Sequence, residues 1–351
     1  MIDVLTLHPG RQTVMEMARR VAGFLGEARE SLDLALYDVR LPGEPGDLVA
    51  DALRDAATRG VRVRIAYNAD HDERIFPPPP RTAPELLEAQ PYPTKGVPGI
   101  PDLMHHKYVV RDGDAVWTGS TNWTTDSWTI QENLIVTTSS PELAAEFTQN
   151  FDELWSTGDV SDSGHKDPRR LDIGGREVRA WFTPGRGEEL SQRIARAIGS
   201  ARRRIRIASP VITAGPVLGT LAEVAAEARV DLRGVVDRTQ MEGVVYQWRT
   251  NGRSAWKIPI LGSVFEHADF TGKPSVPWTP ESVHDFMHAK VTVCDDVVFA
   301  GSFNLSRSGE MNAENVLEVH DVELAELFAG FIDEVRGRYE PMPVPDDGRL
   351  R

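Results

Sequence analysis

The residues best suited to chemistry stand in one stretch of the first half of the chain. His105 and Lys107 come first, two positions apart, so in a strand their side chains project from the same face. Two apolar runs then flank a turn-rich segment, which predicts a β-hairpin, and Ser120 and Asn122 follow it. Because a hairpin brings its outer ends together, an imidazole, an ammonium, a hydroxyl and a carboxamide converge. That set suits a phosphate, with the imidazole in reach of phosphorus or of a leaving oxygen.

A second copy of this stretch lies near the C-terminus. His288 and Lys290 stand 183 positions after His105 and Lys107. The later members lie 182 positions after theirs, which pairs Ser302, Asn304, Glu314 and Asn315 with Ser120, Asn122, Glu132 and Asn133. The two offsets differ by one because the turn of the second hairpin is one residue shorter. Losing a turn residue does not change which side of each strand a side chain projects from. Two of the six lysines in the chain hold these equivalent places, so two unrelated core histidines are a poor explanation.

The repeated pattern, His-x-Lys-x4-Asp followed by Gly-Ser-x-Asn, resembles the phospholipase D superfamily. The resemblance implies two similar α/β/α sandwich domains with mixed, mostly parallel sheets, related by a pseudo-twofold axis with the active site between them. It also implies a phosphohistidine intermediate and neither a metal nor another cofactor. By the same resemblance His105 is the nucleophile and His288 the general acid and then the base, although the symmetry of the motifs leaves that order open.

The other motif residues receive roles from the resemblance and from their chemistry. Lys107, Lys290, Asn122 and Asn304 are expected to bind the non-bridging phosphate oxygens, and Ser120 and Ser302 to add hydroxyl donors. Glu132 and Glu314 resemble family acids that hydrogen-bond to the catalytic imidazoles, the alternative being a solvated charge after a strand. Turn residues Asp112 and Asp295 are interpreted as structural, and His106 and His284 as bystanders.

A metal site is the main competing interpretation of the histidines. It would be built from His105, His106, His284 and His288. Such a site leaves the paired lysines unexplained, because a cation close to a divalent metal is unfavourable.

Composition limits the class of protein. The 351 residues are 40% hydrophobic and 26% charged, which is typical of a soluble protein with room for two domains. No apolar run approaches the ~20 residues of a membrane helix, and the N-terminus has no leader pattern, so we expect a cytoplasmic protein unless a leader has been removed. Cys294 is the only cysteine and is interpreted as a strand residue. The net charge of −14 disfavours a surface that wraps nucleic acid.

Hydrophobic periodicity predicts that the order of elements restarts halfway along the chain. Helix, strand, helix and strand are expected at 13–25, 31–39, 47–58 and 61–67, and a matching series at 178–236. We therefore expect a first domain at 1–157, a linker at 158–175 and a second domain at 176–351. Two excursions, at 70–102 and 237–285, precede the motifs and should border one cleft, the first without regular elements.

The second excursion is rich in aromatic residues. They are expected to line an acyl-chain or base-stacking pocket or to meet a lipid interface, with a small core of the loop itself as the alternative. The candidates for substrate binding are Trp248, Trp256 and Trp278.

The leading hypothesis is a monomeric phosphodiesterase that hydrolyses phospholipid head groups or transfers them to an alcohol, with transient contact to a membrane surface. Two motifs in one chain, the acidic surface and the aromatic excursion favour it. A nuclease and a catalytically silent phosphate-binding module are the alternatives, and the complete His, Lys and Asn sets argue against the second.

Overall fold

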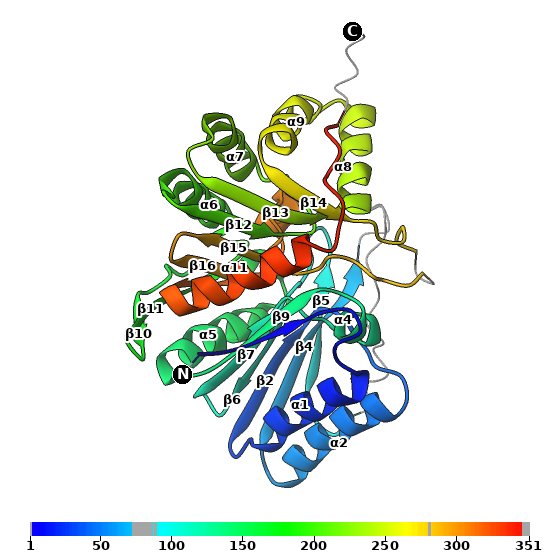
Figure 1. Cartoon of the computed structure of the whole chain (residues 1–351). Coiled ribbons are helices and arrows are strands. Elements are labelled where there is room, and N and C mark those ends of the chain that lie inside the picture. The colour runs from blue at the N-terminus through cyan, green and yellow to red at the C-terminus, as the bar shows by residue number, and fades with distance from the viewer. Residues whose placement is uncertain (1, 72–86, 88–89, 280–281, 346–351) are drawn as a thin grey trace.

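The computed structural model describes residues 2–71, 87, 90–279 and 282–345. Figure 1 shows two halves stacked on each other, each built around one twisted sheet. Most of the first predicted excursion, at 72–86 and 88–89, lies outside the described residues. Among the described residues no helix has both the length and the apolar character that crossing a bilayer requires.

The first half contains a seven-stranded sheet in the order β1-β9-β7-β6-β2-β4-β5. Its strands are β1 (Ile2–Leu7), β2 (Ser31–Leu36), β4 (Arg62–His71), β5 (Thr94–Gly99), β6 (Lys107–Arg111), β7 (Ala115–Gly119) and β9 (Asn133–Ser139). Its helices are α1 (Val14–Gly26), α2 (Glu44–Thr58), α4 (Thr125–Thr129) and α5 (Pro141–Thr157). A separate small sheet pairs β3 (Val39–Arg40) with β8 (Trp123–Thr124).

The second half repeats this order with one extra edge strand, as β10-β11-β17-β16-β15-β12-β13-β14. Its strands are β10 (Leu171–Ile173), β11 (Arg176–Phe182), β12 (Arg204–Ala208), β13 (Asp231–Asp237), β14 (Asp269–Lys273), β15 (Val291–Cys294), β16 (Val297–Gly301) and β17 (Asn315–His320). Its helices are α6 (Gly187–Ser200), α7 (Gly215–Glu227), α8 (Arg238–Asn251), α9 (Lys257–His267), α10 (Arg307–Met311) and α11 (Val322–Arg336). A 3₁₀ turn, Val160–Asp162, lies between the halves.

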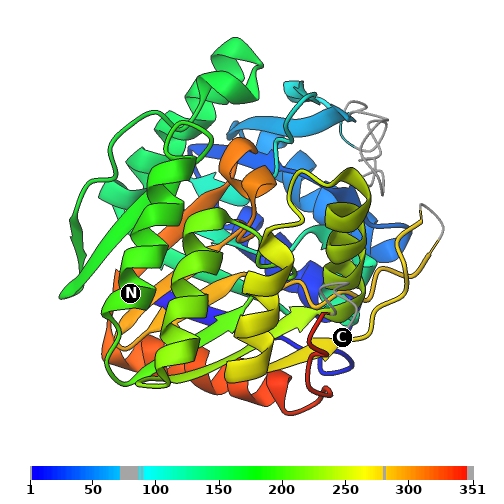
Figure 2. The same cartoon turned by 90° about the horizontal axis from the view of Figure 1, so that it is seen from above.

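Helices cover both faces of each sheet. Helices α5 and α11 lie between the two sheets, α1 and α2 cover the outer face of the first, and α6, α7 and α9 that of the second (Figures 1 and 2). The apolar sides of α5 and α11, including Phe147 and Phe328, belong to one continuous buried cluster that joins the halves. The predicted α/β/α architecture and its duplication are therefore confirmed.

Three details of the sequence prediction are wrong. The two large sheets are mixed but not mostly parallel, because within them only β2-β4, β4-β5, β12-β13 and β13-β14 pair in parallel. The motif hairpins and the returning strands β9 and β17 make the remaining pairs antiparallel. The predicted linker contributes β10 to the second sheet, and the first excursion contains β5.

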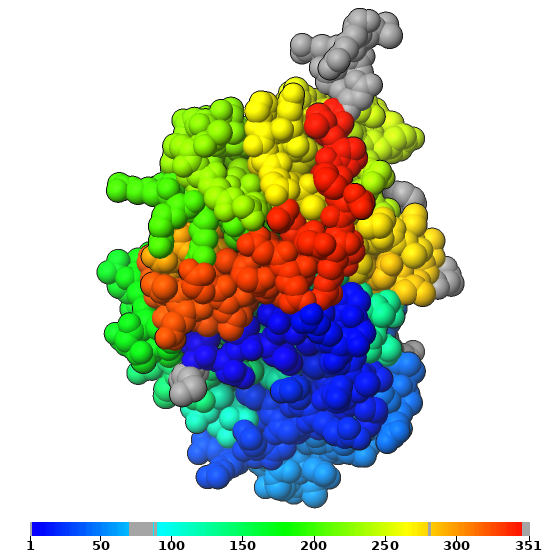
Figure 3. All heavy atoms as spheres, viewed as in Figure 1, coloured from blue at the N-terminus to red at the C-terminus, as the bar shows by residue number. Residues whose placement is uncertain are grey.

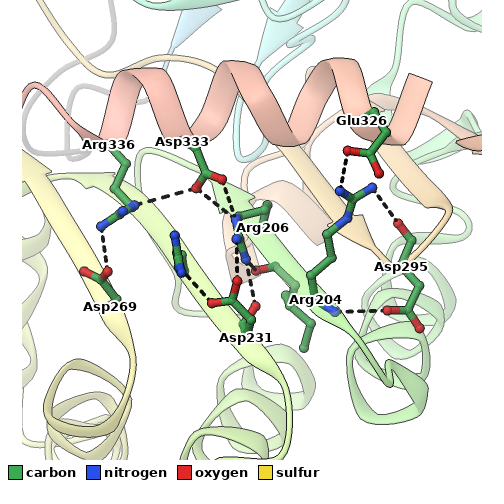
Figure 4. Close-up of polar contacts among 10 residues, drawn as sticks. Arg204, Arg206, Asp231, Asp269, Asp295, Glu326, Asp333 and Arg336 are labelled. Atoms are coloured by element: carbon green, nitrogen blue, oxygen red, sulfur yellow. Dashed lines mark hydrogen bonds and ion pairs between the residues drawn. The ribbon is translucent and has the colours of Figure 1, made fainter. Parts of the chain in front are cut away.

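Ion pairs fix α11 on the second sheet (Figure 4). Asp333 of α11 accepts hydrogen bonds from Arg206 of β12, whose guanidinium also reaches Asp231 of β13 at 2.6 Å. Arg336 bonds to Asp269 of β14 at 2.7 Å. Arg206 is only 5% exposed, so its charge requires these partners.

The interface between the halves also includes the N-terminal segment. In Figure 3 the orange-red α11 meets the blue N-terminal residues. Arg11 Nη1 lies 3.3 Å from Glu334 Oε2 there, and the rings of His8 and Phe331 are 5.1 Å apart. The relative position of the two motif hairpins is thus fixed by a packed interface.

Candidate active site

The two motif hairpins form as the sequence predicts. β6 pairs with β7, and β15 with β16, each across a tight turn whose aspartate has positive φ, 54° at Asp112 and 52° at Asp295. The Asp112 carboxylate accepts the N–H groups of Arg29, Glu30 and Ser31. Asp295 does the same for residues 202–204. Both aspartates therefore anchor the turn, which confirms that they are structural.

The motif glycines permit a close approach between strands. A Cβ at Gly119 would lie 2.2 Å from the Leu134 carbonyl oxygen, and one at Gly301 would lie 2.1 Å from that of Asn315. These contacts place the start of β9 or β17 directly against the Gly-Ser step. The close approach explains why the motif needs glycine at this position.

The motif serines hold these strand starts. Ser120 Oγ accepts the Leu134 N–H at 3.0 Å, and Ser302 Oγ accepts the Asn315 N–H at 3.0 Å. Both serines are fully buried and neither lines the cavity described below. Neither hydroxyl therefore faces the cavity, where the sequence prediction places them, and each holds a strand start instead.

His105 is held by the opposite half of the molecule. Its Nδ1 lies 2.7 Å from Glu314 Oε2, and its backbone N–H donates to the Ala313 carbonyl at 2.9 Å. This confirms the predicted contact between Glu314 and an imidazole. Burial raises the pKa of Glu314 to about 8, against the lowering effect of Lys107.

His288 is also held by the opposite half, but by a neutral group. Its Nδ1 lies 3.1 Å from Asn133 Oδ1, and its backbone N–H donates to the Glu132 carbonyl at 3.2 Å. The Asn133 amide has its Nδ2 directed to Ser127 O at 3.1 Å, while its Oδ1 accepts from Ser120 at 2.6 Å. The amide oxygen therefore faces His288, whose Nδ1 must carry the donated proton.

Glu132 does not contact a catalytic imidazole, so that prediction is wrong. Its Oε2 accepts from Lys273 Nζ at 2.8 Å, and the Tyr339 hydroxyl donates to its Oε1. The Ser120 and Ser302 contacts make Leu134 the counterpart of Asn315, so Asn133 occupies the place of Glu314. Between the motif serine and the strand residue whose N–H it accepts, the first half has one residue more than the second. A sequence alignment that matches Glu132-Asn133 with Glu314-Asn315 misses this extra residue.

The two motif lysines lie side by side with the histidines, below the surface. Lys107 Nζ donates to the His105 carbonyl at 2.5 Å, and Lys290 Nζ to the His288 carbonyl at 2.6 Å. Burial lowers the pKa of Lys107 to about 7, and burial followed by the charge of Lys107 lowers the pKa of Lys290 far below its usual value. Burial and both lysines also hold the pKa of each histidine well below its usual value. A bound anion would relieve this excess of buried positive charge.

A cavity of about 500 Å³ opens over the motifs. His105, His288, Asn122 and Asn304 line its floor. The Oδ1 atoms of both asparagines are buried without a hydrogen-bond partner among the described residues. Each Oδ1 can thus accept a hydrogen bond from a ligand donor such as an alcohol hydroxyl.

The walls of the cavity are mostly apolar and come from α8 and the 275–286 segment. They include Val244, Tyr246, Val276, Pro277, Trp278 and Phe286. The second excursion therefore borders the cavity, as predicted. The opposite wall includes residues 37–40 of the first half, and no described residue of the first excursion lines the cavity.

Only one of the three predicted tryptophans lines the cavity. Trp278 does, and it stacks on His284 with ring centroids 5.6 Å apart. Trp248 is 7% exposed and packs with Phe265 in the apolar core of the second half. Trp256 is 59% exposed and lies outside the cavity. Trp248 and Trp256 therefore do not line the cavity, and Trp248 belongs to the main core of the second half and not to a separate core of the loop.

Sequence reasoning also missed cavity residues on both walls, namely Asp38 and Arg40 on one and His284 on the other. His284, interpreted as a bystander, lines the cavity and lies 3.3 Å from Arg40 Nη2, which is paired with Asp38. Nothing in the periodicity of 37–40 distinguishes these side chains from an ordinary strand end. His106 is fully buried, 3.4 Å from Asn315 Oδ1, and does not line the cavity.

The competing metal interpretation has no support in the geometry. In the part of the chain that the structure describes, no three His, Cys, Asp or Glu side chains are grouped so that they could hold a metal ion. His105 and His288 instead direct Nδ1 at Glu314 and Asn133.

Comparisons with known proteins give the family. The model of the family described as cardiolipin synthase, PLD-like domain, matches residues 21–155 and 194–335, one match in each half. A mitochondrial cardiolipin hydrolase of Chlamydomonas reinhardtii is 29% identical over 140 residues, which are 39% of this chain and 56% of that protein. A phospholipase D of Rickettsia bellii is 28% identical over 132 residues, 37% of this chain and 60% of that protein. The chain thus spans less than two thirds of the length of either relative.

One solved structure extends the likeness to nearly the whole chain. Phosphatidylserine synthase of Haemophilus influenzae superposes on 96% of this chain and 86% of its own, with a TM-score of 0.67 and 15% identity. At that identity the likeness concerns the fold. It agrees with the two stacked halves in Figure 1.

Proposed function

Because this chain belongs to the phospholipase D-like family, we propose that it is a metal-independent phosphodiesterase acting on phospholipids, by hydrolysis or by transfer to an alcohol. The observation that carries the proposal is the meeting of His105 and His288 at one cavity floor, each fixed at Nδ1 by the opposite half. Both imidazoles then have Nε2 as the nitrogen that can exchange a bond or a proton.

The proposed first step is an in-line displacement at phosphorus. His105 Nε2 attacks and the bond from phosphorus to the leaving oxygen breaks. His288, protonated once the bound phosphodiester offsets the charge of the lysines, gives its Nε2 proton to that oxygen. Lys107, Lys290, Asn122 and Asn304 stabilise the negative charge that develops on the non-bridging oxygens. The product is a phosphohistidine on His105 and a free alcohol.

The proposed second step reverses the roles around the same phosphorus. His288, now neutral, takes a proton from water or from an acceptor alcohol while the oxygen attacks phosphorus and the P–N bond breaks. The released phosphate carries the new oxygen, and both imidazoles return to their starting state.

The assignment of His105 as nucleophile follows from its partner. A phosphorylated imidazole is positively charged when Nδ1 keeps its proton, and Glu314, 2.7 Å away, stabilises that charge once its raised pKa allows it to ionise beside the new cation. The neutral Asn133 amide gives His288 less stabilisation, so protonated His288 is the stronger acid of the two. A nucleophile benefits when its charged, phosphorylated form is stabilised, whereas a general acid benefits when its protonated form is stabilised less.

A phospholipid is the proposed substrate class because the cavity walls are apolar and aromatic. Trp278, Phe286 and Val244 offer surface to glycerol carbons or acyl chains beside the phosphate position. Transient contact with a membrane surface belongs to the proposal, since a phospholipid must leave the bilayer to reach the floor.

Product analysis tests the proposal. The protein is incubated with vesicles of phosphatidylcholine, phosphatidylglycerol and cardiolipin, and separately with single-stranded DNA, all in EDTA and with His105→Asn as control. We expect phosphatidic acid, or a transfer product when an alcohol is added, from at least one lipid. Cleavage of DNA alone would replace the proposal by a nuclease, and no cleavage of either would leave a phosphate-binding module.

A further inference from the structure

The outer side of α8 and the short segment that leads from it to α9 carry an unusual surface. Tyr246, Arg249, Arg253 and Trp256, here called the α8 strip, are all exposed, Tyr246 to 69% and Trp256 to 59%. Figure 2 shows α8 at the outer edge of the second half, beside the chain that leads to the second motif. An exposed apolar patch rimmed by polar residues can mark an interaction site, and two large aromatic rings are exposed here beside arginines.

The charge around the α8 strip opposes that of the protein. The chain has a net charge of −14, yet the 23 residues from Gly243 to Phe265 contain three basic residues and no Asp or Glu. The acid immediately before them, Glu242, accepts from Arg238 at 2.8 Å and is thus already neutralised. The segment that carries the α8 strip is therefore basic in sequence, although the chain as a whole is acidic.

The α8 strip is continuous with the cavity. Tyr246 lines the cavity and is itself exposed, and Val276, on the facing segment, lines it and is 43% exposed. At Tyr246 and Val276 the apolar wall of the cavity thus extends from the floor at His105 to the molecular surface, with no polar rim between. A basic and aromatic surface at the mouth of an apolar cavity has the chemistry of an interfacial anchor, with rings at headgroup depth and cations at lipid phosphates.

We propose that the α8 strip docks on a bilayer surface that contains anionic phospholipid, with the cavity mouth turned toward the head groups. This inference rests on the proposed function, since docking would place a lipid phosphodiester at the entrance to the floor. A nucleic acid fits the observations less well, because the valines that extend the wall to the surface offer it no stacking or hydrogen-bonding partner.

Vesicle sedimentation tests the docking surface with the double variant Arg253→Glu/Trp256→Ser. Neither residue lines the cavity, so turnover of soluble bis(p-nitrophenyl) phosphate should stay unchanged. We expect the wild type to bind phosphatidylcholine vesicles containing phosphatidylglycerol more tightly than phosphatidylcholine alone. The variant should bind the anionic vesicles at least about tenfold more weakly, because it loses a cation, gains an anion and loses a ring.

A control with the same change of charge replaces an exposed arginine and an exposed apolar residue elsewhere. Arg196 on α6 and Val322 at the start of α11 are exposed, and Arg196→Glu/Val322→Ser should bind vesicles like the wild type. Equal weakening in both double variants, or no wild-type preference for anionic vesicles, would overturn the inference. Loss of oligonucleotide binding in the strip variant with unchanged vesicle binding would overturn it in favour of nucleic acid.

The experiment also separates the inference from the proposed function. Strip-dependent vesicle binding by a protein that turns over neither lipid nor the soluble diester supports the docking surface and refutes the enzyme. Turnover of lipid with vesicle binding unaffected by the strip variant refutes the docking surface and supports the enzyme.

Discussion

The two halves of the molecule share one order of strands and helices but differ at the atoms that would do the chemistry. Behind His105 stands a carboxylate, Glu314, and behind His288 stands an amide, Asn133. The backbone around both histidines is alike, since each N–H donates to a carbonyl of the other half. The fold therefore creates two equivalent places, and we propose that the difference between two side chains gives the histidines different tasks.

The acid that sequence matching placed behind His288 has another use. Glu132 is buried and forms an ion pair with Lys273 of β14 and a hydrogen bond with Tyr339, which follows α11. It thus ties the end of the second half to the segment that carries Asn133. In the second half the equivalent position is Ala313, whose methyl group cannot form an ion pair or a hydrogen bond.

The largest expected effect comes from removing one histidine at a time. His105→Asn removes the proposed nucleophile, so turnover should fall by more than about 10⁴-fold and no covalent species should form. His288→Asn should still permit attack on a p-nitrophenyl diester, whose leaving group needs little protonation. The base of the second step is then absent, so a phosphohistidine should accumulate. Intact-mass spectrometry after a brief acid-free quench should detect it on the peptide containing His105.

The same measurement can reverse the assignment. An adduct at His288 in the His105 variant would make His288 the nucleophile and would contradict the role given to Glu314. If both variants are inactive and neither carries an adduct, the covalent route itself is refuted.

Exchanging the partners of the histidines should have the next largest effect. Glu314→Gln keeps a hydrogen-bond acceptor but removes the charge behind the nucleophile, so kcat should fall by about 10²–10⁴-fold. Asn133→Asp places a charge behind the acid instead, which raises the pKa of His288 by about one unit or more. A general acid works below its pKa, so the basic limb of the pH–rate profile should move to higher pH.

Thermal unfolding and substrate choice provide the controls for this exchange. Asn133→Asp also faces the Ser127 carbonyl, so a lower melting temperature is expected and the rates must be compared below it. A p-nitrophenyl substrate needs little acid, and its turnover should change less than that of an alkyl ester. Equal loss on both substrates would show that Asn133 has only a structural role.

The sequence was sufficient for the duplication and for both hairpins. His105, Lys107, His288 and Lys290 recur at one spacing, and strand alternation fixes their facing, so only local geometry was needed to place them. Glu132 was misassigned because Glu-Asn follows each motif at the same distance. Backbone pairing of Leu134 with Ser120 decides the alignment, and tertiary contact alone reveals it.

The cavity walls could not be derived from the sequence for a different reason. Whether Trp248 or Trp278 faces the cavity depends on how α8 and the 275–286 segment pack, and aromatic content says nothing of direction. Strand alternation likewise gave no sign that Arg40 would meet His284 across the halves.

A smaller effect is expected on stability when one buried cation is removed. Lys290→Met ends the repulsion between Lys290 and Lys107, so without ligand the variant should be more stable than the wild type by about 1 kcal/mol. Inorganic phosphate should raise the melting temperature of the wild type and not of the variant. Phosphate should bind the wild type more weakly as pH rises above about 7, where Lys107 loses its proton. A less stable variant that still responds to phosphate would contradict this account of the lysines.

The smallest expected effect is that of chelation. Each half would contribute a lysine and an asparagine to the phosphate site. The nearby acidic side chains already have partners, because Glu314 contacts His105 and Glu132 contacts Lys273. EDTA should therefore leave kcat on a soluble diester unchanged, and it should do so equally in the wild type and in Asn133→Asp, which adds a buried carboxylate behind His288. Rates measured with EDTA and after addition of zinc or manganese check this. Activity lost on chelation and restored by one of these metals would mean that the lysines are insufficient to neutralise the phosphate, and the proposed division of work between the halves would fail with them.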